Sequence, residues 1–560
     1  MRLRTLQIVK IFQQFFYVLL LIFMPVLPTT GQIPASGLVA TPDSHATKIA
    51  YDILNQGGNA IDAAVAAMYA LSVVQPYAAG PGAGGLMLIW SAKHQKPYFI
   101  DFREQSPQNV DPSIFYQDSL SFKIYTEYGY QSICTPGMVA GAAKALDLLG
   151  TMTTKDVLQP AFALASEGFA VSEALVNIST ENYRIIESNR TTSALFFPDW
   201  FPLPKSQKQT RPDLALTLKL LATQGPHIFY QGEIANEIID EIIRNNGLLQ
   251  LSDFSNYEAK LRTPVQAEYK NYLIVSSPPP SSGGIALIEL LKILEQVEIS
   301  KHSLNSGPYI HLFVEAMKQV FDDRENYMIE ASQFDGFNSQ LLLSKQHIQG
   351  SISQIDTASA SVVIHPIDTE DARESSNGSH ISVLDKFGNA VAVSITLNGY
   401  FGSAVTIPKY GILLNNAMSS FSSQPGENNS IAPGKRPQTS LTPTIILKNN
   451  QPYLILGGNG AERIISTLAQ IIINIIEFKL SLNDAILSPR FHYNQYEDKI
   501  EMETRIDAEV IDYLKKLGHK INLKTDYDDY FCNAQVILFD PTGQKIAGSD
   551  VRQKGMVYVK

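Results

Sequence analysis

The chain has 560 residues, of which 45% are hydrophobic, and this is enough to bury the core of one large α/β unit or of several smaller domains. Its formal net charge is -10 and no cluster of Lys and Arg suggests a nucleic-acid surface, so we expect small-molecule chemistry and no nucleic-acid partner. Only Cys134 and Cys532 are present, which excludes a disulfide framework and a cysteine-based zinc site. The two thiols could pair in an oxidising compartment, but isolated, buried cysteines are the expected arrangement.

The first residues are typical of a secretory signal. Arg2, Arg4 and Lys10 form a basic start, and the apolar stretch from Phe15 to Leu27 is too short to cross about 30 Å of hydrocarbon comfortably. We therefore predict that residues 1–31 are a signal peptide and that the mature protein is exported, to the periplasm or outside the cell, with no integral membrane segment. Because an Ala-x-Ala cleavage site is absent, an uncleaved anchor is the alternative.

A helical hairpin and two strands are predicted next. Residues 45–54 have helical spacing, and after a glycine pair Asn59 can cap a second helix that runs through Val74. The apolar segments 86–90 and 98–102 predict two paired strands.

The rest of the chain mixes helices and strands. The stretch from about Gly141 to Asn246 is mostly helical in pattern, and residues 285–295 predict another helix. Residues 380–385 and 390–397 alternate and are β-branched, which predicts a hairpin, and a similar hairpin begins at Ala534. Strands and helices occur in both halves without a regular βαβ order, so we expect sheets layered between helices.

Several motifs occur in an order that one enzyme family shares. The glycine-rich run at 80–85 lacks the Lys-Ser/Thr ending of a phosphate-binding loop and leads into a strand, so it is not interpreted as a phosphate site. The motifs, in chain order, are Gly57-Gly-Asn-Ala-Ile-Asp-Ala-Ala64, Asp101-Phe-Arg-Glu104, Thr135-Pro-Gly-Met-Val-Ala-Gly141, Pro278-Pro-Pro-Ser-Ser-Gly-Gly284, His311 through Arg324, Leu413-Leu-Asn-Asn416, Pro433-Gly-Lys-Arg-Pro437 and Arg463-Ile-Ile465. On these motifs the chain resembles the gamma-glutamyltranspeptidase family from about residue 38 to about residue 555.

The resemblance implies an α+β fold, a four-layer αββα sandwich of the amino-terminal-nucleophile hydrolase type. Residues 32–377 would form a large-subunit-like region and residues 378–560 a small-subunit-like region of this one fold. Family members are made as one precursor that cuts itself just before a threonine, whose Oγ then attacks a γ-glutamyl carbonyl with its own α-amine as general base. This chemistry uses only the protein, so we expect no cofactor, and no metal ligand is assigned from the sequence.

The attacking threonine of the family is a glycine in this chain. In the family it stands two residues before a histidine at the head of a strand and 18 residues before a second threonine. These two residues are His380 and Thr396 here, and counting back from either one leads to Gly378. Glycine has no side-chain oxygen, so it can neither cut the precursor nor carry an acyl group. The resemblance therefore implies a degenerate nucleophile position and a chain that is not processed.

A neighbouring hydroxyl, Ser379, is the candidate replacement for the missing threonine. Successive side chains of a strand point to opposite faces, so this shift of one residue directs Ser379 away from the pocket unless the strand slips or bulges. The competing interpretation is that Ser379 is an ordinary residue at the start of a strand.

The family residues that hold the substrate carboxylate are kept. Arg103 matches the arginine that clamps the α-carboxylate, for which a bidentate guanidinium is the natural partner. Asn398 and Thr396 match a pair that lines the pocket, and Thr439 and Ser440 lie where the family has two hydroxyls that grip the same carboxylate. A surface salt bridge is the alternative interpretation of Arg103.

The ammonium end and the oxyanion loop differ from the family. The family often has acids at the positions of Ala417 and Ser420, so a γ-glutamyl ammonium would lose two charge-assisted contacts, each worth about 1.5–3 kcal/mol. Glutathione should then bind poorly. The oxyanion site matches Gly460 and Ala461, where alanine replaces a glycine and matters only if its φ is positive. The run Gly457–Gly460 could alternatively be only a tight turn.

Together these differences predict a gamma-glutamyltranspeptidase-like protein with lost or strongly reduced glutathione hydrolase and transpeptidase activity. It would still bind a small carboxylate or a γ-glutamyl-like ligand near Arg103. One alternative is an active amino-terminal-nucleophile hydrolase, a γ-glutamyl hydrolase or transferase or an acylase, that uses Ser379. Another is an ordinary glutathione hydrolase whose alignment with the family is shifted locally at Gly378.

Overall fold

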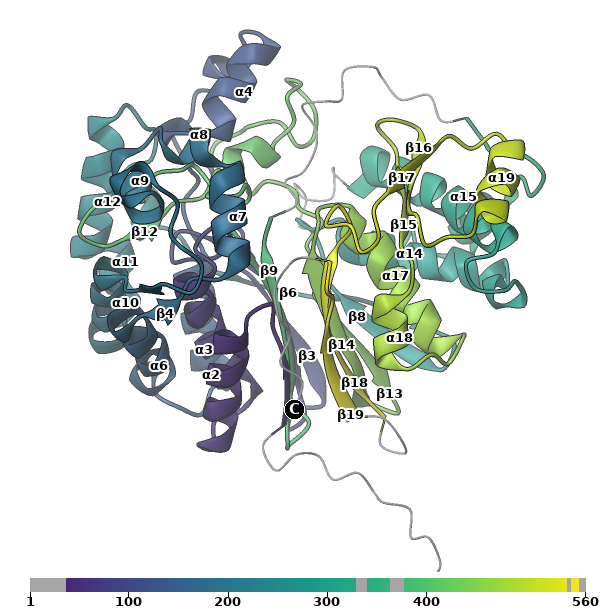
Figure 1. The fold of residues 1–560 in the computed structure, drawn as a ribbon, viewed down its shortest axis with the longest axis horizontal. Coiled ribbons are helices and arrows are strands. Elements are labelled where there is room, and N and C mark those ends of the chain that lie inside the picture. Colours follow the sequence, from purple (N-terminus) through teal and green to yellow (C-terminus); the bar gives the residue numbers. More distant parts are fainter. Residues whose placement is uncertain (1–36, 329–339, 363–376, 541–544, 553–560) are drawn as a thin grey trace, which may run out of the picture.

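Two six-stranded β-sheets lie face to face between two layers of helices in the computed structural model (Figure 1). The structure describes residues 37–328, 340–362, 377–540 and 545–552, so the predicted signal peptide lies outside the described residues. In those ranges no helix is both long enough and apolar enough to cross a membrane. The layering is the predicted α+β, four-layer αββα arrangement.

The first sheet contains the predicted pair of strands at 86–90 and 98–102 and the predicted hairpin at 380–397. Its strands, in spatial order, are β1 (Gly37–Ala40), β9 (Ser379–Asp385), β10 (Ala390–Thr396), β2 (Gly84–Ser91), β3 (Lys96–Asp101) and β6 (Lys260–Arg262). β2 pairs antiparallel with β3, and β9 pairs antiparallel with β10. Because a strand has a period of two residues, Met87 and Ile89 join the core under the helices whereas Leu86 and Leu88 join the core shared with the second sheet. Both faces of this sheet are therefore buried.

The second sheet is assembled from both halves of the chain. Its strands, in spatial order, are β19 (Lys545–Ser549), β18 (Asn533–Phe539), β14 (Gln451–Asn459), β13 (Thr444–Lys448), β8 (Tyr272–Ser276) and β7 (Val265–Tyr269). Segments before and after residue 378 contribute strands to each sheet. The two predicted regions, 32–377 and 378–560, are thus interleaved in one fold.

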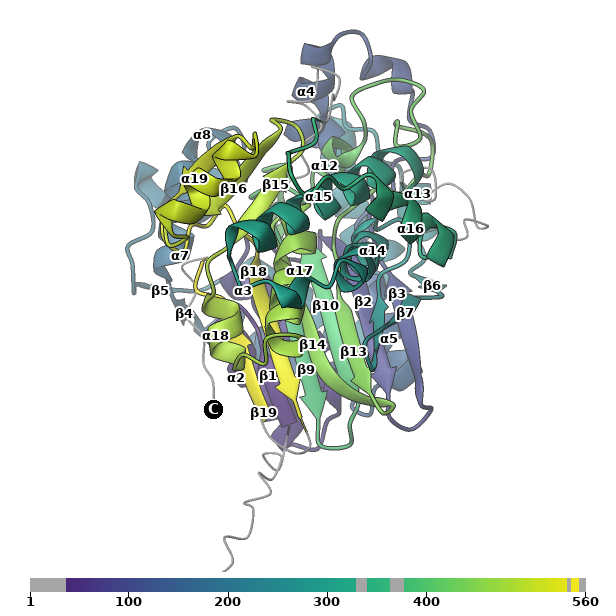
Figure 2. The ribbon, with the colours of Figure 1, turned by 90° about the vertical axis from the view of Figure 1, so that its right-hand side faces the viewer.

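Helices cover the outer face of each sheet. Those that pack on the first sheet or on its helical layer are α2 (Ser44–Asn55), α3 (Ala60–Val74), α5 (Met138–Leu149), α6 (Thr154–Glu167), α7 (Glu173–Glu181), α8 (Tyr183–Ile186), α9 (Arg190–Phe196), α10 (Pro212–Gln224), α11 (His227–Tyr230), α12 (Glu233–Arg244) and α13 (Leu251–Ser255). Those on the second side are α14 (Gly283–Gln296), α15 (Gly307–Asp323), α16 (Lys345–Ser353), α17 (Arg463–Ile476), α18 (Leu482–Leu487) and α19 (Ala508–Lys516). Figure 2 shows α14, α17 and α18 lying over the second sheet.

Short elements complete the chain. α4 (Ser119–Glu127) projects at one end of the molecule in Figure 1. The remaining strands are β4 (Phe169–Ala170), β5 (Lys208–Gln209), β11 (Thr406–Ile407), β12 (Ile412–Leu413), β15 (Phe491–Asn494), β16 (Lys499–Glu503) and β17 (Ile521–Lys524). The predicted helical character of the central stretch is confirmed, because α5 to α12 occupy most of it.

Helix α3 is buried along its whole length, as its sequence requires. Every residue from Ala60 to Val74 is buried, and apolar side chains surround the helix on all sides. The predicted cap is confirmed: Asn59 accepts from the N–H of Asp62, and the Asp62 carboxylate accepts from the N–H of Asn59 at 2.8 Å. This capping box satisfies backbone donors that would otherwise be buried without partners.

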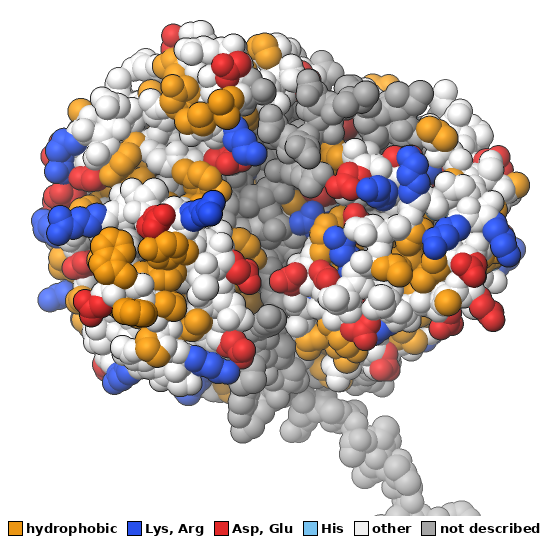
Figure 3. All heavy atoms as spheres, turned by 45° about the horizontal axis from the view of Figure 1, so that its top comes forward, with side chains coloured by type: hydrophobic (Ala, Val, Ile, Leu, Met, Phe, Trp, Pro, Cys, Tyr) orange, Lys and Arg blue, Asp and Glu red, His pale blue; other side chains and the backbone are white. Residues whose placement is uncertain are grey.

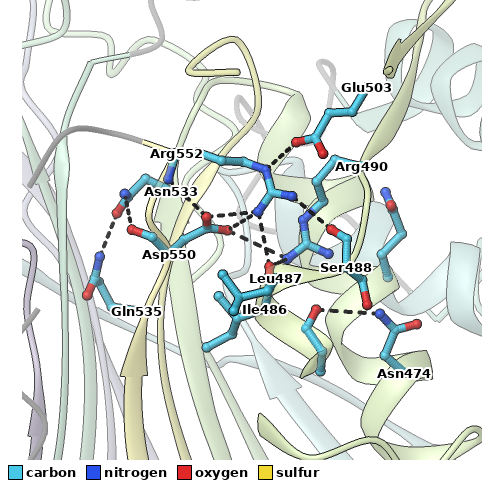
Figure 4. A network of polar contacts seen from close by, with 12 residues as sticks. Asn474, Ile486, Leu487, Ser488, Arg490, Glu503, Asn533, Gln535, Asp550 and Arg552 are labelled. Carbon is cyan, nitrogen blue, oxygen red and sulfur yellow. Dashed lines mark hydrogen bonds and ion pairs between the residues drawn. The ribbon is translucent and has the colours of Figure 1, made fainter. Parts of the chain in front are cut away.

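A buried ionic network joins the end of the chain to α18 and β16 (Figure 4). Arg552 donates from Nη1 to Asp550 at 2.8 Å and from Nε to Glu503 at 2.7 Å, and Arg490 lies 3.6 Å from Asp550. All four side chains are buried. Two guanidinium groups face two carboxylates, so the buried charges balance.

The two cysteines follow the expected arrangement. Cys134 and Cys532 are both buried and unpaired. Burial raises the pKa of each thiol, which keeps both in the neutral form. They act as small apolar side chains in separate cores.

Charged side chains are mixed over the surface. In Figure 3 basic and acidic side chains are interspersed over both halves of the molecule, and the described part of this face carries no continuous basic area.

Asp385 is the residue whose replacement tests how the β9–β10 turn is joined to α3. Its carboxylate accepts from the N–H groups of Ala60, Phe387 and Asn389 at 3.0, 2.8 and 2.9 Å and from Asn389 Nδ2 at 2.7 Å. Asp385→Ala is expected to lower the free energy of unfolding by about 3 kcal/mol, because buried donors lose a charged acceptor. Urea denaturation measures this, with Asp52→Ala on the exposed face of α2 as a control that should change it by less than about 0.5 kcal/mol.

Candidate active site

Gly378 stands at the entrance to β9, on the face that meets the second sheet. A Cβ placed on Gly378 would lie 3.1 Å from the carbonyl oxygen of Ile395 and 3.6 Å from Thr396 Oγ1. His380, two residues on, packs so closely against Gly457 of β14 that a Cβ there would lie 2.2 Å from its ring. Residues 378 and 380 share a face because strand side chains alternate. A side chain at position 378 would therefore lie between the sheets, beside Thr396.

Ser379 points the other way. Its side chain is buried, and Oγ donates to Oε1 of Gln75, at the end of α3, at 2.8 Å. The pairing of β9 with β10 is regular from Ser379 onward, with no slipped or bulged residue. The hydroxyl thus faces the helical layer rather than the space between the sheets.

Thr396 fixes the backbone that leads into Gly378. Its Oγ1 donates to the carbonyl oxygen of Asn377 at 2.9 Å and accepts from the N–H of Asn398 at 2.8 Å. Asn377 in turn donates from Nδ2 to the carbonyl oxygen of Tyr77 at 2.7 Å. The two predicted pocket residues, Thr396 at the end of β10 and Asn398 just after it, therefore lie next to the predicted nucleophile position.

His380 is a neutral core residue. Burial lowers its pKa to about 3, and Nδ1 shares a hydrogen bond with Ser394 Oγ at 2.7 Å. The imidazole is therefore uncharged at neutral pH.

Arg103 lies behind Ser420 in a buried chain of polar contacts. Its guanidinium donates from Nη1 to Glu104 at 2.7 Å and from Nη2 to Ser420 Oγ at 3.1 Å, and Ser420 donates to Asn398 Oδ1 at 2.6 Å. Arg103 and Glu104 are both fully buried, so the interpretation of Arg103 as a surface salt bridge is wrong. Burial raises the pKa of Glu104, although the guanidinium beside it acts in the opposite direction.

A second arginine, Arg324, holds the predicted hydroxyl pair. It follows α15 and donates from Nη2 to Ser440 Oγ at 3.2 Å and from Nε to Ser282 Oγ at 3.0 Å. Ser282 also donates its N–H to the carbonyl oxygen of Thr439 at 3.0 Å. The sequence places Arg324 at the end of a family motif but does not indicate a role for it. Its buried position beside Ser440 is visible only in the folded chain.

A cavity of about 80 Å³ is bordered by both Arg324 and Ser420. Its walls are formed by Arg324, Glu325, Ser419, Ser420, Phe421, Ser422, Glu427, Asn429, Gln438 and Tyr496. Ser420 lies between this cavity and Arg103. The other predicted lost-acid position does not line it, because Ala417 is buried in an apolar cluster with Phe115, Phe122 and Met418. Only one of the two substituted positions, Ser420, therefore faces the candidate ligand space.

The predicted oxyanion residues lie across from the start of β9. Gly460 and Ala461 follow β14 with φ of +138° and +52°, so Ala461 adopts the left-handed conformation that strains a side chain. Within the described ranges neither N–H has a hydrogen-bond acceptor. The residues before them, 457–459, pair with β18, so the interpretation of the whole run as a tight turn is wrong. The predicted oxyanion donors are thus without a hydrogen bond in the described part of the chain.

Ala461 provides a test of this backbone strain. Ala461→Gly is expected to raise the free energy of unfolding by about 1 kcal/mol, because glycine adopts a positive φ without a Cβ clash. Ala469→Gly, within helix α17, should lower it by about 1 kcal/mol or more. Urea denaturation of both variants checks the opposite signs, and a loss of stability in Ala461→Gly would contradict the strain.

Comparison with known proteins identifies the fold and the family. The gamma-glutamyltranspeptidase family model matches residues 46–559. The chain is 37% identical over 532 residues to a glutathione hydrolase proenzyme of Escherichia coli (strain K12), covering 92% of this chain and 90% of that protein. It is 33% identical over 505 residues to the acylase ACY 1 proenzyme of Pseudomonas sp. (strain SE83), covering 88% and 89%.

Solved structures agree with this assignment. The cephalosporin acylase from Bacillus halodurans superposes with a TM-score of 0.83 at 26% identity, covering 94% of this chain and 96% of that chain. The predicted fold of the amino-terminal-nucleophile hydrolase type is thereby confirmed, and so is the resemblance drawn from the motifs. This chain belongs to the gamma-glutamyltranspeptidase family.

Proposed function

We propose that this chain is an exported family member that is not processed, has lost or strongly reduced glutathione hydrolase and transpeptidase activity, and binds a small carboxylate. The observation that carries the proposal is Gly378, at the head of β9 and beside Thr396, where the family has its nucleophile. Both steps of the family chemistry need the missing oxygen. Without it, no hydroxyl attacks the carbonyl of residue 377 to cut the chain, and no new amino terminus forms to act as general base.

The acylase alternative requires Ser379 as nucleophile. The similarity to acylases and the uncharged Ser420 favour a substrate without an α-ammonium group. Ser379, however, donates to Gln75 on the helical face of β9, and the regular β9–β10 pairing would have to shift by one residue to turn it around. This geometry favours the unprocessed chain over an active acylase.

The ligand proposal rests on two buried guanidinium groups beside one small cavity. Arg324 forms part of its wall, and Arg103 lies one hydrogen bond behind Ser420. The Nε of Arg103 is buried and donates to no group in the described part of the chain. An unused buried donor favours an anionic acceptor, and a carboxylate that displaces the Ser420 hydroxyl would supply one.

The first test is whether the purified protein is one chain. Intact mass spectrometry is expected to show a single polypeptide, and incubation with a γ-glutamyl anilide is expected to release no aniline. Two fragments that meet at residue 378 or 379 would contradict the proposal. Cell fractionation tests the export part, for which the mature chain should be recovered outside the cytoplasm.

Restoring the hydroxyl is a second test. Gly378 has a φ of +154°, which a threonine would have to relax, and the added hydroxyl would then lie beside Thr396 on the inter-sheet face. Gly378→Thr is therefore expected to start self-cleavage before residue 378. Gly378→Ala adds a Cβ without an oxygen and should stay uncut, which makes it the matched control. If Gly378→Thr stays uncut while Ser379→Ala abolishes an activity of the wild-type protein, the chain is an enzyme that uses Ser379.

Ligand preference tests the loss of the acid at position 420. Glutarate is expected to bind at least about 10-fold more tightly than L-glutamate, because a buried ammonium group without an acidic partner costs more than about 1.4 kcal/mol. Ser420→Asp should reduce or reverse this preference. Ser423→Asp adds the same charge in the same loop outside the cavity wall and should leave it unchanged. Isothermal titration calorimetry measures all three, and equal affinities in the wild-type protein would contradict the prediction.

A further inference from the structure

Three ionisable side chains from three helices of the second layer converge away from the nucleophile position. They are Glu289 of α14, Asp323 at the end of α15 and His347 of α16. His347 Nε2 lies 2.7 Å from Asp323 Oδ2 and 3.3 Å from Glu289 Oε1. Glu289 is fully buried, whereas the His347 side chain is 28% exposed. The cluster therefore has a buried end and an end that solvent reaches.

The cluster holds two carboxylates with little positive charge beside them. Oε2 of Glu289 is buried and accepts from no donor in the described ranges. The guanidinium of Arg324, which follows Asp323 directly, is turned toward Ser282 and Ser440 instead. Two adjacent carboxyl groups must share either a proton or a cation.

A second cluster, His311 and Glu315 of α15 with His519, differs because its ligand atoms already have hydrogen-bond or ion-pair partners. His311 Nδ1 and His519 Nε2 are hydrogen-bonded to each other at 2.8 Å, and His311 Nε2 contacts the carbonyl oxygen of Asp356 at 2.8 Å. The Glu315 carboxylate already accepts from Lys318 Nζ at 2.8 Å. These ligand atoms are occupied by protons and by a lysine charge. Of these two clusters in the described part of the chain, the Glu289 cluster is the one without a lysine or arginine partner.

The geometry points to a bound ion: we propose that Glu289, Asp323 and His347 form a site for a divalent transition-metal cation such as Zn²⁺. Two ligand atoms at about 2.0–2.2 Å from one tetrahedral or octahedral ion lie roughly 2.8–3.6 Å apart. The distances from His347 Nε2 to the two carboxylates, 2.7 and 3.3 Å, reach that range with small side-chain rotations. An imidazole ligand favours zinc-type ions over Mg²⁺ and Ca²⁺, which prefer oxygen.

The ion would stabilise the end of α15 and the backbone next to the candidate active site. Asp323 is the last residue of α15, and the π-helical turn η5 (Arg324–Met328) begins at the following residue. Arg324 donates to Ser440, one of the predicted carboxylate-binding hydroxyls. An ion held by Asp323 would thus position the arginine that lines the ligand cavity. The site itself does not depend on whether the chain turns over a substrate.

Zinc titration of the full-length protein tests the site. After treatment with EDTA and dialysis, isothermal titration calorimetry with ZnCl₂ is expected to show one ion per chain, and MgCl₂ should bind at least about 10-fold more weakly. Glu289→Gln keeps the side-chain shape and removes the charge, and His347→Gln removes the imidazole. Each should weaken zinc binding by at least about 10-fold and abolish the zinc-dependent rise in Tm. His227→Gln, at an exposed histidine outside the cluster, should change neither.

The outcomes separate the proposal from its competitors. If no zinc binds to the wild-type protein, the three groups share a proton and the proposal is overturned. Zinc binding that persists in both Glu289→Gln and His347→Gln would place the ion elsewhere and overturn it as well. If Glu289→Gln does not fold, His347→Gln decides, because that position is partly exposed and tolerates replacement.

Discussion

Strand β9 lies between a helical layer and a second sheet, and its side chains alternate between these two environments. This alternation decides which side chains at the start of the strand can reach the space between the sheets. Both faces of the strand are buried, so each side chain is committed to one environment. Residue 378 and His380 face the second sheet, and Ser379 faces Gln75 below α3. A hydroxyl one position along the chain therefore occupies the wrong face. The pairing of β9 with β10 contains no bulge or register shift that would turn the Ser379 side chain to the other face.

Near this strand, the proposed ligand-binding arginines are held by buried side chains. Arg103 is paired with Glu104 and covered by Ser420, which bridges it to Asn398. Arg324, which lines the cavity, donates a hydrogen bond to Ser440. Ser420, at a position where the resemblance implies an acid, keeps the chain of hydrogen bonds intact without a charge. The small cavity beside it is lined by Arg324 together with Glu325 and Glu427.

The helical layer behind the second sheet carries its own electrostatic constraint. Buried carboxylates are stable only when a proton, a cationic side chain or a metal ion balances them. Glu315 has Lys318, and Asp550 and Glu503 have Arg552. Among the described residues, the ionisable partner of Glu289 and Asp323 that could carry a positive charge is His347. Because Asp323 adjoins Arg324, the charge state of this cluster bears on the ligand cavity.

Local patterns in the amino-acid sequence were enough to predict several elements and to propose Gly378 as the altered nucleophile position. Alternation marked the β9–β10 hairpin, Asn59 marked the start of α3, and motif spacing led to Gly378, because these features depend on residues close together in the chain. The folded chain was needed to show that Arg103 is buried behind Ser420 and that Ala417 belongs to an apolar cluster. It was also needed to show that Ala461 has a positive φ and that Arg324 reaches Ser440. Each of these depends on contacts between distant segments or on backbone geometry, which local patterns do not encode.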